Sequence, residues 1–252
     1  MSGALAGQRA VVVGGTAGIG LATARMMLAE GARVIVAGRS PDRGAAAVAA
    51  LGPGADYIRC NAADPADCVA LAEQGADRMG GIDVLMSCGG GDPNPRLLRD
   101  IPVDELMADV SGALAPVIQS ARAVMPVMAA QKSGSIICVA SDAGKLATPG
   151  EVAIGTAMAG IIMFCRAMAN EAKRDGIRVN CLTPSIVEGT PLHDRLMADP
   201  FAGRLFGKAK TLAHLGVVVP EDLAAMAVFL ASPQAARITG QTISVTGGIS
   251  AI

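Results

Sequence analysis

One ten-residue stretch, Val11–Gly20, constrains the fold of this chain more than any other. It opens with three consecutive β-branched valines, which is typical of a buried parallel strand. A glycine cluster follows, and an apolar helical pattern then runs over 21–30 up to Gly31. Glycines let a backbone approach phosphate groups, and the first N–H groups of a helix point at them. The stretch therefore predicts a strand, a turn and a helix N-terminus that together hold a pyrophosphate.

Strand and helix patterns alternate along the rest of the chain. Strands are expected at about 10–14, 33–37, 56–60, 82–86, 134–140, 177–182 and 241–245, and helices at 41–51, 65–79, 102–130, 151–174 and 220–231. Pro116 and Pro126 are expected to break or kink the longest helix. The alternation predicts an α/β fold, a Rossmann-type doubly wound parallel sheet of about seven strands.

No linker or internal repeat divides the chain, so residues 1–252 are predicted to form a single domain. Residues 183–219 are expected to be mostly irregular, with short helical pieces and both histidines. Such a long connection is unusual in a compact domain and is often a lid or a substrate-binding loop. We therefore expect a substrate or lid loop at about 183–219.

Composition excludes several classes of partner. With 21 Lys and Arg against 22 Asp and Glu, the net charge is −1, which favours neither nucleic acid nor an anionic membrane surface. No apolar stretch is expected to reach the length of a membrane span, and residues 1–9 lack the pattern of a signal peptide. The cysteines fit no C-x-x-C or zinc spacing, so no metal is expected, and free buried thiols in a reducing cytoplasm are predicted. The six are Cys60, Cys68, Cys88, Cys138, Cys165 and Cys181.

Four blocks together resemble the short-chain dehydrogenase/reductase family over about residues 7–248. The first is Gly14-x-x-x-Gly18-Ile19-Gly20, although Val13 stands where the family usually has threonine. The others are Arg-Val-Asn at 178–180 followed by a proline at 184, the segment 220–232, and the segment 238–248. Family members pair through the helix equivalent to 151–174 and through the last strand, so the resemblance implies a homodimer or homotetramer.

The resemblance also implies a nicotinamide dinucleotide cofactor. A carboxylate after the second strand would bind the ribose 2′-hydroxyl of NAD, but here Gly38 is followed by Arg39. A guanidinium pairs well with a phosphate, which favours NADP(H) over NAD(H); a solvated loop cation is the alternative for Arg39. Asn61 stands where the family often has an aspartate near the adenine. The expected cofactor contacts are Gly14, Thr16, Gly18, Ile19, Gly20, Arg39, Asn61, Gly89 and Val187.

The residues that resemble the family's catalytic positions are unusual. Ser141 fits the family serine, but Ile154 stands thirteen residues later in place of the tyrosine, and Met158 stands four residues further on in place of the lysine. Tyr57, the only tyrosine, lies at the start of the third expected strand. Loss of a positioned proton donor costs about 10²–10⁴ in rate, so carbonyl–alcohol hydride transfer by the family's usual route is not expected. The replaced positions expected in the substrate pocket are Ile154, Met158, Ser111 and Ser185.

Three functional hypotheses follow. In the first, the chain is an enzyme with different chemistry on a small, fairly apolar substrate: reduction of an activated C=C or C=N bond, isomerisation, elimination or cyclisation. Its candidate polar residues are Ser141, Asp142, His193, Lys145 and Glu188. A capping role is the alternative for Asp142, and solvent exposure is the alternative for the last three. In the second hypothesis, the chain is a catalytically silent subunit or nucleotide sensor, paired with itself or with an active paralogue. The third, an ordinary dehydrogenase, is disfavoured because no other tyrosine exists.

Overall fold

Seven parallel strands form one sheet in the order β3-β2-β1-β4-β5-β6-β7. The computed structural model describes residues 3–91 and 94–252. The strands are β1 (Arg9–Val13), β2 (Arg33–Gly38), β3 (Ala55–Arg59), β4 (Val84–Ser87), β5 (Gly134–Val139), β6 (Ile177–Pro184) and β7 (Thr242–Val245). From β1 the chain first adds strands on one side, β2 and β3, and then on the other side, beginning with β4. Sheets of this kind bind ligands at such a switch point, outside the carboxyl ends of the strands. The predicted doubly wound parallel sheet is confirmed.

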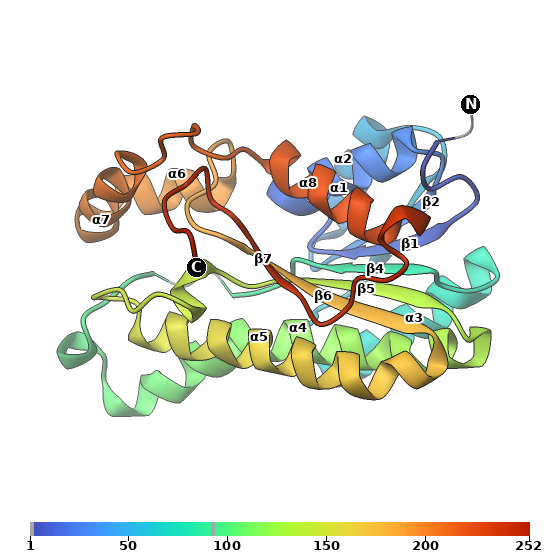
Figure 1. Cartoon of the computed structure of the whole chain (residues 1–252), viewed down its shortest axis with the longest axis horizontal. Helices are drawn as coiled ribbons and strands as arrows, with labels where there is room; N and C mark the ends of the chain where they lie inside the picture. Colours follow the sequence, from blue (N-terminus) through green and yellow to red (C-terminus); the bar gives the residue numbers. More distant parts are fainter. Residues whose placement is uncertain (1–2, 92–93) are drawn as a thin grey trace.

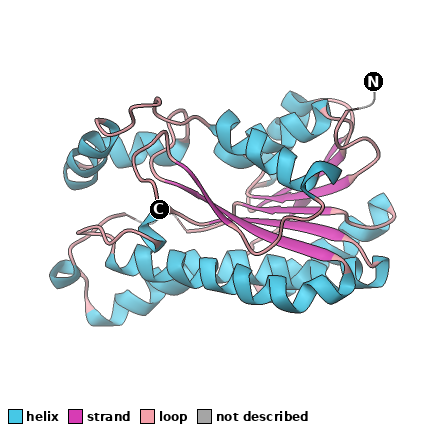
Figure 2. Ribbon diagram, viewed as in Figure 1, coloured by secondary structure: helices cyan, strands magenta, loops and turns pink. Residues whose placement is uncertain are grey.

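Helices cover both faces of the sheet (Figure 1 and Figure 2). They are α1 (Gly18–Ala29), α2 (Pro41–Leu51), α3 (Pro65–Met79), α4 (Val103–Gln131), α5 (Val152–Ala172), α6 (Pro191–Ala198), α7 (Pro200–Lys210) and α8 (Pro220–Ala231). Helices α3, α4 and α5 pack on one face, and α1, α2 and α8 pack on the other. Val11 and Val13 point to the first layer while Val12 points to the second, which explains the run of valines in a strand buried on both sides.

Two details of the sequence prediction differ in the structure. Helix α4 runs without interruption from Val103 to Gln131, so neither Pro116 nor Pro126 breaks it. The segment after β6 contains the expected short helical pieces as two helices, α6 and α7, and is less irregular than predicted. Each begins with a capping residue followed by proline at the first helical position: Thr190 accepts a hydrogen bond from the His193 N–H, and Asp199 accepts from the Phe201 and Ala202 N–H groups.

Helices α4 and α5 are long and apolar enough, by length and composition alone, to cross a membrane. The expectation that no apolar stretch reaches this length is therefore wrong. Both helices lie against the sheet and carry its largest cluster of buried side chains, from Val117 in α4 to Ala172 in α5. Their apolar character serves the core of the domain.

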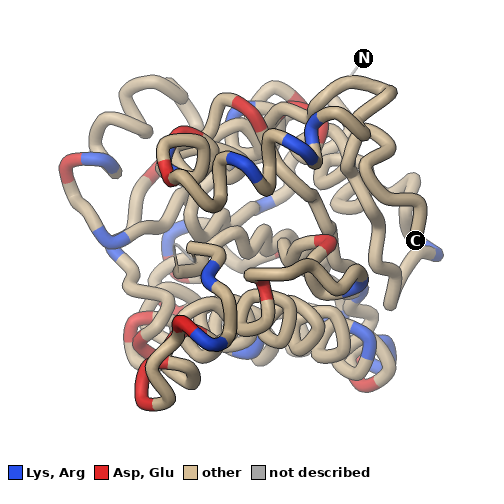
Figure 3. The backbone as a smooth tube through the Cα atoms, turned by 90° about the vertical axis from the view of Figure 1, so that its left-hand side faces the viewer, with Lys and Arg blue, Asp and Glu red and all other residues tan. Residues whose placement is uncertain are grey.

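Charged residues of both signs are interspersed on the end of the molecule shown in Figure 3. All six cysteines are free, and all but Cys88 are buried, as predicted. Among the described residues, no group of three or more histidine, cysteine or acidic side chains is arranged to hold a metal ion.

Candidate functional site

A cavity of about 780 Å³ opens at the carboxyl ends of the strands. Its walls come from the segments that follow β1, β2, β4, β5 and β6, from the first half of α5, and from α6 and α7. Most of the residues singled out in the sequence line it. They are Gly14, Thr16, Gly18, Ile19, Gly20, Arg39, Gly89, Ser141, Asp142, Ile154, Met158, Ser185, Val187 and His193.

The glycine turn after β1 is shaped by close backbone packing. Gly14 has a φ of +75°, and a Cβ atom there would lie 3.0 Å from the carbonyl group of Cys88 in the loop after β4. A Cβ at Gly20 would collide with the Gly14 carbonyl oxygen, so α1 packs directly on the turn. No side chain caps the α1 N-terminus at Ala17, and its first turn holds no acidic residue. The exposed N–H groups of that first turn therefore remain available to an anion.

Two arginines line the part of the cavity next to β2 and α2. Arg39 follows β2, and Arg43 lies in the first turn of α2, which Ser40 caps by accepting from the Arg43 N–H at 3.3 Å. Both guanidinium side chains are exposed and line the cavity. Tyr57 packs against Gly44 of α2 and donates from its hydroxyl to the Gly38 carbonyl oxygen at 2.8 Å, so it supports this corner structurally.

Two expected contacts are not in the cavity wall. Asn61 is absent from the lining, although Cys60 and Ala62 on either side belong to it. The Asn61 amide oxygen accepts from the Ala63 N–H at 3.4 Å, which keeps the side chain in its own turn. Ser111 is exposed on α4, one position before Gly112, which does line the cavity. A one-residue step turns a side chain by about 100° around a helix, and this rotation carries Ser111 away from the site.

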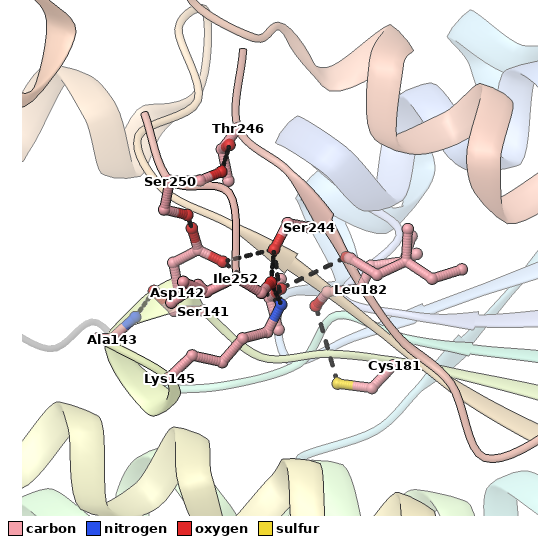
Figure 4. Close-up of polar contacts among 12 residues, drawn as sticks. Ser141, Asp142, Ala143, Lys145, Cys181, Leu182, Ser244, Thr246, Ser250 and Ile252 are labelled. Atoms are coloured by element: carbon pink, nitrogen blue, oxygen red, sulfur yellow. Dashed lines mark hydrogen bonds and ion pairs between the residues drawn. The ribbon is translucent and has the colours of Figure 1, made fainter. Parts of the chain in front are cut away.

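The segment after β5 holds the serine and aspartate proposed for chemistry (Figure 4). Ser141 caps the short helix η2 (Asp142–Gly144) by accepting from the Ala143 N–H at 3.2 Å. Asp142 is 5% exposed and accepts hydrogen bonds from Ser250 and, at 3.3 Å, from Ser244. Lys145 lies 3.8 Å from the Asp142 carboxylate and donates to the Ser244 hydroxyl at 2.6 Å. We call Asp142, Lys145, Ser244 and Ser250 the tail network, because they fasten the last described residues to the end of β5.

Helix α5 approaches η2 unusually closely. A Cβ atom at Gly144 would lie 2.7 Å from the backbone of Met158 and Ala159, and one at Gly155 would lie 2.7 Å from the Ala143 carbonyl oxygen. Only hydrogen at both positions permits this packing. Ile154 and Met158 of α5 and Ser141 before η2 all line the cavity. Ile154 is 9% exposed, and neither side chain can transfer a proton.

The α6–α7 segment, residues 183–219, forms the remaining wall. Lys210 bridges two groups there: its ammonium donates to the Glu188 carboxylate at 2.7 Å and lies 2.8 Å from His193 Nε2. His193 Nδ1 lies 3.0 Å from the Asp194 carboxylate. Both ring nitrogens of His193 are thus engaged within the segment. The hydrogen bond from Lys210 lowers the pKa of Glu188.

Comparison with known proteins supplies the family. The family model described as enoyl-(acyl carrier protein) reductase matches residues 14–250. Momilactone A synthase of Oryza sativa subsp. japonica is 34% identical, over 98% of this chain and 92% of that protein. The 3-oxoacyl-[acyl-carrier-protein] reductase FabG of Chlamydia pneumoniae is 32% identical, over 98% of both. The chain belongs to the short-chain dehydrogenase/reductase family.

Solved structures agree with this assignment. A short-chain dehydrogenase/reductase family protein superposes with a TM-score of 0.84 at 32% identity, covering 98% of each chain. The crystal structure of gox2181 superposes with a TM-score of 0.89 at 26% identity, over 97% of this chain and 96% of that one. Family membership makes this chain an oxidoreductase by descent and associates its glycine turn with a nicotinamide dinucleotide.

Several residues that line this short-chain dehydrogenase/reductase cavity escaped the sequence analysis. The most consequential is Glu151, the residue that precedes α5, whose pKa is raised by burial. Arg43 lies four residues beyond Arg39, and Thr190 lies within 3.3 Å of where a Gly18 Cβ would be. Helix-capping patterns could have revealed Arg43 and Thr190. Only the packing of η2 on α5 reveals Glu151.

Cys88 also lines the cavity, and its pKa bears on the chemistry. Desolvation by the atoms packed around its sulfur raises the pKa of the Cys88 thiol to about 12, although the residue as a whole is only half-buried. The thiol is therefore protonated at neutral pH and is a poor nucleophile. Covalent catalysis through Cys88 does not fit this environment.

Proposed function

We propose that this chain is an NADP(H)-dependent reductase that acts on an activated C=C or C=N bond of a small, apolar substrate. The observation that carries the proposal is the composition of one continuous cavity. It joins a glycine turn with two arginines to an apolar end at Ile154 and Met158, where the family resemblance would place the tyrosine and lysine. A volume of about 780 Å³ lies within the usual range for ligand pockets, about 300–1,000 Å³.

The residues of the first half fit a phosphorylated dinucleotide. The uncapped first turn of α1 would hold the pyrophosphate through its backbone N–H groups. The close turn at Gly14 carries no side chain that would keep the phosphates away from this backbone. Arg39 and Arg43 would hold a 2′-phosphate on the adenine ribose, because guanidinium groups pair bidentately with phosphate. When bound, the reduced dinucleotide would supply a hydride to the substrate.

The second half is suited to an apolar substrate. Besides Ile154 and Met158, its lining includes Leu146, Leu192 and Phe206. Ser141 keeps a hydroxyl hydrogen available while its oxygen accepts from Ala143, so it can orient a substrate oxygen. An activated double bond needs less proton assistance than a ketone, and this site lacks the phenol that serves ketones.

The α6–α7 segment is assigned the role of lid. Thr190 of this segment lies beside Gly18 of the glycine turn, and the contacts of Lys210 with Glu188 and His193 fasten α7 to α6 and to the connection that follows β6. His193 then acts through the lid, by positioning, and Asp142 acts through the tail network. Excluding water from the apolar end would strengthen electrostatic interactions during hydride transfer.

The test begins with NADPH and NADH titrations followed by cofactor fluorescence. Tighter binding of NADPH is expected, because the two arginines recognise the extra phosphate. Cyclohexenone, cinnamaldehyde and a cyclic imine are then compared with an acetoacetyl thioester as a ketone control. Oxidation of NADPH by the alkenes or the imine, and not by the ketone, supports the proposal. Failure to bind either dinucleotide, or faster reduction of the ketone, contradicts it.

A catalytically silent subunit is the second candidate, and exposed apolar side chains on two helices favour it. Met107 on α4 is 64% exposed and Met163 on α5 is 60% exposed. Contact with a second copy, or with an active paralogue, would cover such residues. Light scattering would distinguish a monomer from the expected homodimer or homotetramer. NADPH binding without turnover, together with co-purification of a paralogue, would establish the silent subunit.

Six unpaired thiols fit a reducing compartment, so the cytoplasm is the proposed location.

A further inference from the structure

Two carboxylic acids lie among the described residues that line the cavity, Asp142 and Glu151. The tail network occupies the first of them. Ser250 and Ser244 donate to its two oxygens and Lys145 faces it at 3.8 Å, as Figure 4 shows. Both oxygens of this carboxylate are therefore engaged within the protein. Glu151 is the acid that remains.

Glu151 stands where the α5 backbone enters the site. It precedes Val152 as the N-cap residue, and Ile154 and Met158 follow it three and seven positions later. Residues at these spacings lie on one face of a helix, and all three line the cavity. The close packing at Gly144 and Gly155 fixes this face against η2. Glu151, which is half-buried, therefore lines the same cavity as Ile154 and Ser141.

The surroundings of Glu151 favour its protonated form. Burial is the largest cause of its raised pKa, and a hydrogen bond with Thr148 opposes the shift. The ion pairs of the described residues do not include Glu151. Buried carboxyl groups without a cationic partner are the ones that proteins use as acids near neutral pH.

Charged groups from several neighbouring elements lie around this end of the cavity. Arg96, whose N–H donates to the neighbouring Gly150 carbonyl at 2.8 Å, is paired with Glu105 and Asp109. From the segment after β5 come Asp142 and Lys145, which pair with each other. From α6 and α7 come His193, Arg195 and Lys208. Of these described charged groups, none contributes to the raised pKa of Glu151, which follows from burial.

We propose that Glu151 is the proton donor of this site, and that its carboxyl group protonates the substrate atom that gains negative charge during reduction. The inference rests on the proposed reductase function. In the step, the substrate double bond accepts a hydride at one atom and a proton at the other. The Glu151 O–H bond breaks, its electron pair stays on the carboxylate, and water at the half-buried cavity mouth returns the proton.

A pH dependence with a defined sign follows. The donor works only while it is protonated, so the rate is at its plateau below the raised pKa of Glu151 and falls as pH rises through it. A donor elsewhere, or none, would leave the rate flat over this interval.

The experiment compares three variants by NADPH oxidation with cyclohexenone. Glu151→Gln keeps the shape of the side chain and removes the proton, so kcat is expected to fall by about 10²–10⁴ and to lose its pH dependence. Glu151→Asp keeps the acid and is expected to restore part of the rate together with the falling limb. Glu171→Gln is the matched control, because Glu171 is an exposed residue of the same helix. All three are expected to keep the wild-type Kd for NADPH.

A second readout does not depend on turnover. Carbon-13 NMR of glutamate-labelled protein follows each carboxyl group through a pH titration, and the resonance missing in Glu151→Gln identifies Glu151. A titration above the ordinary glutamate value is expected; a titration at or below that value overturns the inference. Full activity of Glu151→Gln on cyclohexenone overturns it as well, while the proposed function stands. If the wild type reduces no alkene or imine, the proposed function fails, and a raised pKa then reflects burial alone.

Discussion

The contact between α5 and η2 gives the sharpest test of how this site is held together. Gly155→Ala adds a single methyl group at the point where α5 passes the Ala143 carbonyl oxygen. The new Cβ would lie 2.7 Å from that oxygen, whereas ordinary contact begins at 3.4 Å, so the two elements must separate by about 0.7 Å. The atom in the way belongs to the backbone, which cannot rotate aside.

The magnitude follows from two opposing terms. Overpacking of a filled interior costs about 1–3 kcal/mol. Alanine in place of glycine inside a helix returns about 0.5–1 kcal/mol. The net loss of unfolding free energy is therefore up to about 2.5 kcal/mol, which for a chain of this length lowers Tm by up to about 10 °C. Because Glu151 and Ile154 move with the helix, catalysis should suffer more, since a displacement of about 1 Å can cost about 10² in rate.

Thermal unfolding followed by circular dichroism suits a chain without tryptophan. The matched control is Gly207→Ala in α7, where a Cβ would meet no atom within 4 Å. That substitution is expected to raise Tm slightly, because it changes helix propensity alone. If Gly155→Ala is as stable as Gly207→Ala and leaves turnover unchanged, the close contact does not position the site.

Three further predictions concern the cofactor, the replaced tyrosine and lysine positions, and the lid. Arg39→Asp is expected to weaken NADPH binding by at least tenfold, about 1.4 kcal/mol, and to favour NADH in fluorescence titrations; an unchanged ratio would show that Arg39 is a solvated loop cation. Ile154→Tyr combined with Met158→Lys is expected to create reduction of the acetoacetyl thioester, measured as NADPH oxidation, if only the phenol and the ammonium are missing. The lowered pKa of Glu188 means that its contact with Lys210 stabilises the lid above the ordinary carboxyl range and is lost as pH falls through the lowered value. The protection of the α7 amides, taken relative to their intrinsic exchange rate at each pH, should therefore fall on acidification, and Glu188→Gln should remove this pH dependence.

Local patterns were sufficient to predict the frame of the molecule. Three valines, a glycine cluster and an apolar helix specify β1, the turn and α1 without reference to the rest of the chain. The same holds for α3, where Asp64 and a proline mark the start and Gly80 marks the end. Short helical pieces were expected in the lid, but their bounds were not predicted, although Thr190 and Asp199 carry the same capping signal.

The site depends on contacts that no local pattern contains. Asp142 was interpreted as a candidate for chemistry, but Ser250, 108 positions away, donates to it. Glu151 was passed over because its burial depends on how η2 packs on α5. Asn61 and Ser111 were placed by family position, and the orientation of each side chain depends on its own turn or helix. Sequence thus located the segments that line the cavity but not which of their side chains face it.

The tail network also sets an order of assembly. The glycine turn is complete once the loop after β4 has been made, at Cys88, because its N–H groups bond to Ala37 and Gly14 packs on the Cys88 carbonyl group. The wall at Asp142 waits for Ser244 and Ser250, about a hundred residues later in synthesis. Such long-range contacts form late, since loop closure comes before they contribute. A ribosome-bound chain will therefore form the phosphate-binding end of its cavity well before the wall at Asp142 is closed. A chain whose synthesis stops before residue 250 will have only the phosphate-binding end in its final form.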